Sequence, residues 1–191
     1  MDAHYVHKMI KVFRYVFKDG IQPSNFLIYS LKRENRKDVL DFLADELADS
    51  ILFSIPDCEK YIYTAVPRRR SEKVKYGYDH AENLARAVAK RLKGKYMKTL
   101  ISNAKHAQKK AANREERYKN AKFKLKNKNL DLDGENVIII DDIVTTGASM
   151  GMAAMLLKSA GAGKIVGASI AIAYKDAYTP FATGDRFSLY K

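Results

Sequence analysis

The sequence predicts an α/β domain whose mainly parallel central sheet is flanked by helices. Two apolar runs rich in β-branched and small residues, 137–140 and 165–173, are typical of strands buried on both faces of a sheet. A helical pattern at 148–160 separates them, and a strand, a helix and a second strand precede them. Strands that alternate with helices favour parallel pairing, because a parallel pair needs a long crossover between its strands.

The first half of the chain shows three helical patterns and one strand pattern. Apolar residues recur at helical spacing over 5–17 and over 38–53, so both segments are predicted as amphipathic helices. Residues 61–66 form a short apolar strand that leads into a basic loop. Asp79 is expected to cap the third helix, which ends near Gly94.

The second half begins with a predicted strand at 96–101. Residues 102–120 are polar and basic and lack an apolar face. An irregular segment of this length in a compact domain is usually functional or disordered. A turn at Asp133-Gly134 then precedes the buried strand at 137–140, and Gly161 follows the helix at 148–160.

The length of 191 residues, with 47% hydrophobic residues, fits one folded domain. Residues 1–56 are expected to form an N-terminal helical segment that packs on a core domain at 57–191. No apolar run approaches the roughly 20 residues of a membrane span, and no signal peptide is evident, so a cytoplasmic protein is expected. Cys58 is the only cysteine, which excludes an internal disulfide and favours a buried thiol.

The net charge of +13 is concentrated in the middle of the chain. Residues 67–130 carry 21 Lys and Arg against 5 Asp and Glu, whereas the remainder carries 14 against 17. Such a block can bind nucleic acid, a membrane surface or a phosphate-rich ligand, and it can equally be a solvated lysine-rich surface. Charge alone leaves these alternatives open.

The strand at 137–140 runs into a stretch that carries chemistry. Asp141 and Asp142 follow it at the end where open α/β sheets bind ligands. The small and hydroxylated residues of 145–149 then lead into a helix, whose N–H groups and dipole favour an anion. Carboxylates for sugar hydroxyls beside a loop for phosphate suit a sugar phosphate. An isolated Asp-Asp pair is more often turn or cap chemistry, but this combination is harder to dismiss.

Residues 138–149 resemble the phosphoribosyl pyrophosphate (PRPP) signature of type I phosphoribosyltransferases. The resemblance implies that fold, and it implies that Asp141 and Asp142 are catalytic residues that hold the ribose. It also implies that a cradle holds the 5′-phosphate, formed by Thr145, Thr146, Gly147, Ala148 and Ser149. In purine-salvage members an Asp that contacts the base typically stands at the position of Thr145, which speaks against hypoxanthine or guanine salvage.

More of the chain is similar to the ComF branch, which is also described as amidophosphoribosyltransferase-like. The similarity spans roughly residues 28–173 and rests on short matches: Leu31-Lys32, Val66-Pro67, residues 76–85, Gln108, Arg117, Asn120 and Phe123. Tyr76, Asp79 and His80 depart from the usual Arg, Asn and Gln. The cysteine-rich zinc element of many members has no counterpart.

The resemblance assigns roles to the basic segments. It implies that pyrophosphate binds at Pro67, Arg68, Arg69 and Arg70, where guanidinium groups can make bidentate contacts to phosphate oxygens. It implies that residues 102–120, including Gln108 and Arg117, form a mobile loop that closes over the site and excludes water. Mg²⁺ is the expected cofactor, held mainly through PRPP, and a homodimer is the expected assembly.

The leading functional hypothesis is transfer of the phosphoribosyl group from PRPP to a nitrogen nucleophile, with release of pyrophosphate. His80 and His106 are candidates for a general base, although a capping or solvated role is more common for such residues. A glutaminase step lacks its nucleophile, because Cys58 lies inside the chain.

Two alternatives stay open: a non-catalytic protein of this fold that binds single-stranded DNA or a competence partner, and a PRPP-sensing regulator. Tyrosines among the basic residues could stack on bases. They are Tyr76, Tyr78, Tyr96 and Tyr118.

Overall fold

The computed structural model describes residues 5–16, 23–34, 36–68, 77–102 and 123–174. Its strands are β1 (Lys8–Val16), β2 (Ile62–Ala65), β3 (Lys95–Tyr96), β4 (Leu100–Ser102), β5 (Phe123–Leu125), β6 (Val137–Val144) and β7 (Ile165–Tyr174). Its helices are α1 (Pro23–Arg33), α2 (Lys37–Ser54), the 3₁₀ turn η1 (Cys58–Lys60), α4 (His80–Arg91) and α6 (Ala148–Ser159). Within these ranges, no helix has the length and apolar character needed to cross a membrane.

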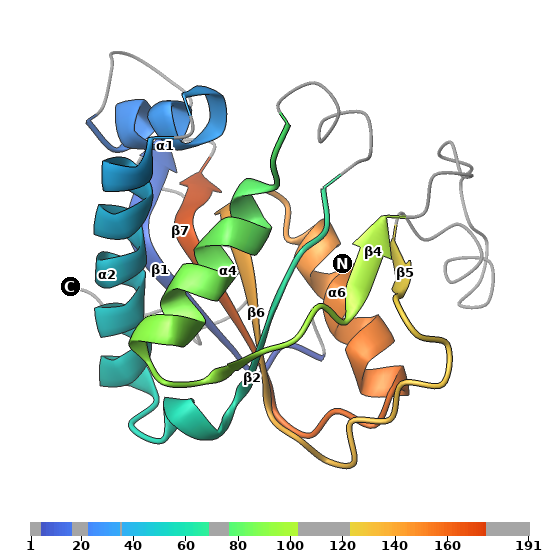
Figure 1. Cartoon of the computed structure of the whole chain (residues 1–191). Helices are drawn as coiled ribbons and strands as arrows, with labels where there is room; N and C mark the ends of the chain where they lie inside the picture. Colours follow the sequence, from blue (N-terminus) through green and yellow to red (C-terminus); the bar gives the residue numbers. More distant parts are fainter. Residues whose placement is uncertain (1–4, 17–22, 35, 69–76, 103–122, 175–191) are drawn as a thin grey trace.

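The strands form a parallel five-stranded sheet in the order β1-β7-β6-β2-β3, and β4 and β5 form a separate antiparallel pair. From β2 the chain crosses through α4 to β3 on one side, and from β6 it crosses through α6 to β7 on the other (Figure 1). The direction of winding therefore reverses between β2 and β6. In open α/β sheets such a switch point opens a crevice at the carboxyl ends of the strands, where ligands bind.

Helices cover both faces of the sheet, as the sequence predicts. One buried cluster joins α1, α2 and α4 to the sheet, and a second joins α6 and the β4–β5 pair to the opposite face. Because β6 lies between them, its first four side chains are completely buried, alternating between the two clusters. This burial explains the unbroken run of branched apolar residues at 137–140.

Most predicted elements are confirmed. The helices expected at 38–53 and 148–160 are α2 and α6, and the third helix is α4, which the Asp79 carboxylate caps by accepting from the Glu82 N–H at 3.2 Å. The turn at Asp133-Gly134 has positive φ at both residues, 45° and 77°.

The helix predicted at 5–17 is wrong, because residues 8–16 form strand β1. This strand pairs in parallel with β7 along nearly its whole length, from Lys8 opposite Val166 to Val16 opposite Tyr174. Its β-branched and aromatic residues suit a strand, and the long free edge of β7 offers the backbone partners. The N-terminal segment 1–56 is therefore not entirely helical, while its boundary with a core domain at 57–191 stays a prediction.

The structure differs from the sequence prediction at two further places. The strand predicted at 96–101 is divided between β3 and β4, because the Thr99 N–H lies 3.5 Å from the Thr64 Oγ1 and does not meet a backbone oxygen of β2. Helix α1 was not predicted, although Pro23 stands at its first position, where proline is favoured. Ile28 and Leu31 bury one side of this helix.

Replacing a core leucine on α4 tests the packing described above. Leu84 is fully buried, so Leu84→Ala should lower the free energy of unfolding by about 3 kcal/mol, through lost burial and a cavity. Leu52→Ala is the matched control, because Leu52 on α2 is 49% exposed and should lose less than about 1 kcal/mol. Urea unfolding followed by circular dichroism measures both. Equal losses would contradict this packing of α4.

Candidate functional site

The candidate site lies where β6 extends beyond its neighbour β2. Pairing between the two strands ends at Ala65 and Ile140, so residues 141–144 of β6 run on with β7 on one side only. The sequence predicted that Asp141 and Asp142 follow the strand, whereas the strand continues through both residues to Val144. They still lie at its carboxyl half, beside the switch point.

Each of the two carboxylates accepts a hydrogen bond from the backbone N–H of the residue that follows it in β6. Asp141 Oδ1 accepts the Asp142 N–H at 2.9 Å, and Asp142 Oδ1 accepts the Ile143 N–H at 2.7 Å. These contacts orient both side chains. Asp142 is buried and Asp141 is half-buried, so both carboxylates are largely shielded from solvent at the carboxyl end of β6.

Arg68 reaches the same place from the end of β2. Its Nη2 lies 3.4 Å from Asp142 Oδ2, and the two side chains are 14% and 10% exposed. The pair therefore bridges the two strands between which the winding reverses. A residue predicted to bind pyrophosphate and one predicted to hold ribose are in contact. Pro67 precedes Arg68 and is buried.

The turn after β6 forms the start of helix α6. Gly147 is the N-cap, with a φ of 73° that side-chain-bearing residues rarely adopt. The Thr146 hydroxyl accepts the Ala148 N–H at 3.4 Å, and Ser149 lies in the first helical turn. Helix α6 has no acidic residue in that turn, so the positive end of its dipole is not neutralised within the helix.

Helix α4 also begins at the carboxyl ends of the parallel strands (Figure 1). His80, one of the two candidate bases, is its first residue and is only 1% exposed. The ring of Tyr78 packs against it edge-on, with centroids 4.4 Å apart. His80 is therefore a buried part of the packed start of α4, and the cap of this helix is Asp79.

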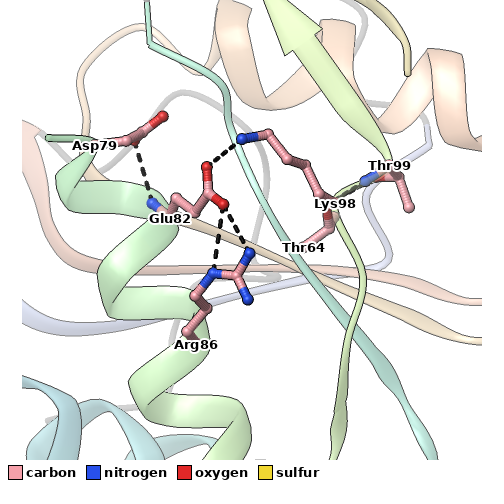
Figure 2. A network of polar contacts seen from close by, with 6 residues as sticks. All are labelled: Thr64, Asp79, Glu82, Arg86, Lys98 and Thr99. Carbon is pink, nitrogen blue, oxygen red and sulfur yellow. Dashed lines mark hydrogen bonds and ion pairs between the residues drawn. The ribbon is translucent and has the colours of Figure 1, made fainter. Parts of the chain in front are cut away.

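A polar network that the sequence analysis missed ties α4 to the segment before β4. Figure 2 shows Glu82 receiving two partners: Lys98 Nζ at 2.5 Å from one carboxylate oxygen, and Arg86 Nη2 at 2.9 Å from the other. Burial raises the pKa of Glu82, but the hydrogen bonds from Lys98 and Arg86 outweigh it and hold the pKa below its usual value. The i, i+4 spacing of Glu82 and Arg86 was the available sequence signal.

Beside this network, two buried hydroxyl groups join β2 to the same segment. Thr64 Oγ1 and Thr99 Oγ1 are 2.8 Å apart, and both residues are almost completely buried. Together with the Lys98–Glu82 pair, this contact fixes the base of the β4–β5 pair against β2 and α4. The network thus holds in place the segment that leads toward residues 103–122.

Cys58 lies away from the site. It is a buried thiol in η1, before the amino end of β2, whereas Arg68 follows the carboxyl end of that strand. Burial raises the pKa of the thiol. The sequence prediction of a buried thiol is confirmed.

Several predicted site residues lie outside the described part of the chain. They are Arg69, Arg70, His106, Gln108 and Arg117. The structure thus brings together Arg68, Asp141 and Asp142 with the turn at 145–149, which joins acidic groups, one guanidinium and a helix N-terminus. This combination suits a phosphorylated ligand that carries hydroxyl groups.

The family model described as "Phosphoribosyl transferase domain" matches residues 79–182, which is more than half of the chain. The chain belongs to the phosphoribosyl transferase domain family. The match includes α4, β6, the turn at 145–149 and α6, whereas Pro67 and Arg68 precede it. The match supports the type I phosphoribosyltransferase superfamily, while the ComF branch stays a prediction. No curated protein matches the chain.

Solved structures of similar fold include relatives of low sequence identity. "Structure of the allosteric regulatory enzyme of purine biosynthesis" matches with a TM-score of 0.50 and 16% identity, over 74% of this chain and 30% of that one. Adenine phosphoribosyltransferase from Saccharomyces cerevisiae matches at 0.48 and 18%, over 73% and 71%. The enzyme of the same name from Thermoanaerobacter pseudethanolicus matches at 0.47 and 17%, over 74% and 83%.

Glu82→Gln tests the network of Figure 2 in this phosphoribosyl transferase domain. Because folding lowers the pKa of Glu82, its contribution to stability is fully present above the usual glutamate pKa and is lost as the pH falls through the lowered value. The variant should be less stable than the wild type by about 1 kcal/mol at pH 7, and this difference should shrink toward pH 3. Chemical unfolding at several pH values measures it.

Glu46→Gln on the exposed side of α2 is the matched control and should behave like the wild type throughout. A stability loss for Glu82→Gln that does not change with pH would mean that the lost contacts are not ionic.

Proposed function

We propose that this protein binds PRPP with Mg²⁺ and transfers the phosphoribosyl group to a nitrogen nucleophile, releasing pyrophosphate. The observation that carries the proposal is the contact of Arg68 with Asp142 directly beside the turn that opens α6. Groups suited to pyrophosphate, ribose and a 5′-phosphate lie near one switch point, which supports the proposal. Membership of the phosphoribosyl transferase domain family supports the same reaction class.

Each part of the site would take one part of PRPP. The carboxylates of Asp141 and Asp142 would accept hydrogen bonds from the ribose hydroxyls. The turn would hold the 5′-phosphate through backbone N–H groups and hydroxyl donors, with Gly147 allowing the close approach. Arg68, with Arg69 and Arg70, would contact the pyrophosphate and balance its charge.

The donor set of this chain fits Mg²⁺. The ion prefers oxygen ligands and is usually bound through one or two carboxylates together with substrate phosphates. Asp141 and Asp142 are the residues that could hold it, alongside PRPP oxygens. When bound, Mg²⁺ neutralises the negative charge that grows on the leaving pyrophosphate.

In the reaction, the bond between C1 and the pyrophosphate oxygen breaks, and the oxygen keeps the electron pair. The nucleophile donates its electron pair to C1, and the resulting ammonium-type nitrogen then loses a proton to water. Positive charge develops on the ribose in between, so the nearby carboxylates stabilise it electrostatically. Positioning and charge balance are therefore the main tasks of the site. Ammonia or another amine would be the acceptor.

One observation bears on the alternative of single-stranded DNA binding. Tyr96, a candidate for base stacking, has Arg86 over its ring at 4.1 Å from the centroid, and burial raises the pKa of its hydroxyl. Its ring is thus engaged within the fold. DNA binding, a competence partner, PRPP sensing and a homodimer remain predictions, and the proposed enzyme is the hypothesis that the site favours.

The double variant Asp141→Asn/Asp142→Asn tests the assignment of the ribose site. Loss of two carboxylate acceptors should weaken PRPP binding in the presence of Mg²⁺ by at least about 100-fold, as measured by calorimetry. Asp131→Asn/Asp133→Asn makes the same charge change in the turn before β6 and should keep wild-type affinity. Absence of wild-type binding at millimolar PRPP would overturn the proposed function.

Gly147→Ala tests the phosphate cradle. The added Cβ meets nothing within 4 Å, so the cost comes from the left-handed backbone, at about 1 kcal/mol of stability. Gly134→Ala is matched, since Gly134 also has a positive φ with open space around it. Both variants should lose similar stability, but only Gly147→Ala should weaken PRPP binding. Equal affinities would contradict the cradle.

A further inference from the structure

The contact between Arg68 and Asp142 has a chemical consequence for the order in which ligands bind. Asp142 lies on β6 and Arg68 in the segment that follows the neighbouring strand β2, and both side chains are largely buried, at 14% and 10% exposure. In such surroundings a carboxylate is costly without a positive partner. Arg68 supplies that positive charge in the ligand-free protein.

The same carboxylate is where a divalent cation would approach. Asp142 Oδ1 is engaged by the Ile143 N–H, and Oδ2 faces the Arg68 guanidinium. A cation that approaches Oδ2 therefore meets a positive charge already in place. Because a guanidinium group is positively charged, Arg68 repels a cation at this position.

The geometry also allows this contact to be exchanged. The 3.4 Å separation exceeds the usual 2.7–2.9 Å of a tight charge-assisted hydrogen bond. Phosphate oxygens offer arginine a bidentate partner at shorter distances than this 3.4 Å contact. A ligand that carries pyrophosphate next to Asp142 can therefore draw Arg68 away from it.

We propose that Arg68 is the counter-ion of Asp142 in the ligand-free protein and makes divalent-cation binding depend on prior or simultaneous binding of the sugar pyrophosphate. The inference rests on the proposed function for the identity of that ligand. Before it binds, Arg68 holds Asp142 and excludes the metal. Once Arg68 moves to the pyrophosphate, Asp142 is released to the metal or to a ribose hydroxyl.

The test measures binding of Mn²⁺ alone, as a spectroscopic substitute for Mg²⁺, by electron paramagnetic resonance and calorimetry. Wild-type protein should bind Mn²⁺ weakly. Arg68→Met should bind it at least about tenfold more tightly, because the competing charge is gone. Arg68→Met/Asp142→Asn should lose that gain, which assigns the new affinity to Asp142.

A surface pair provides the matched control. Arg36 and Asp38 are joined at 2.5 Å, and their side chains are 50% and 65% exposed. Arg36→Met removes the same charge from an arginine–aspartate pair and should leave Mn²⁺ affinity unchanged. An equal gain in this control would attribute the effect to net charge and would overturn the proposal.

Two further outcomes are decisive. Arg68→Met that is folded by circular dichroism but binds Mn²⁺ no better than wild type overturns the counter-ion role. If Arg68→Met does not fold, Arg68→Gln provides the same comparison with a polar, uncharged side chain. Failure of the wild type to bind PRPP overturns the proposed function, whereas a gain of Mn²⁺ binding in Arg68→Met would still support the counter-ion role.

Discussion

Parallel pairing of β6 with both β2 and β7 is the constraint on which the rest of this protein depends. Because β6 is hydrogen-bonded on both sides and covered on both faces, its first four residues must all be apolar. The pairing of β6 with β2 ends at Ile140 of β6, so polar side chains of β6 that could contact a ligand begin after this residue. Asp141 and Asp142 occupy this first available position, so the core places the candidate site.

The site combines opposite charges in a sheltered position. Arg68, which follows β2, and Asp142 of β6 lie next to the N-terminus of α6, which adds a partial positive charge. Two carboxylates, Asp141 and Asp142, thus lie beside one guanidinium and a helix N-terminus in the described part of the site. The basic excess of residues 67–130 begins at this same point, with Arg68.

The supporting structure around the site depends on side chains that no motif indicates. Glu82 joins α4 to Lys98, and Thr64 joins β2 to Thr99, so the segment before β4 is attached to both elements. Neither contact follows from sequence spacing, since 16 residues separate the first pair and 35 the second. Only the i, i+4 pair of Glu82 and Arg86 had a local signal.

The sequence by itself determined the elements that are specified by a clear local pattern of residues. The run at 137–140, the capping residue Asp79 and the glycine turn at Gly147 each impose a local structure, and the PRPP-type signature follows from their order. Tertiary structure decided the ambiguous segments. The apolar spacing of β1 suits a helix as well as a strand, and the free edge of β7 selects the strand. Likewise, the meeting of Arg68 with Asp142 required β2 and β6 to become neighbours, because 74 residues separate the pair along the chain.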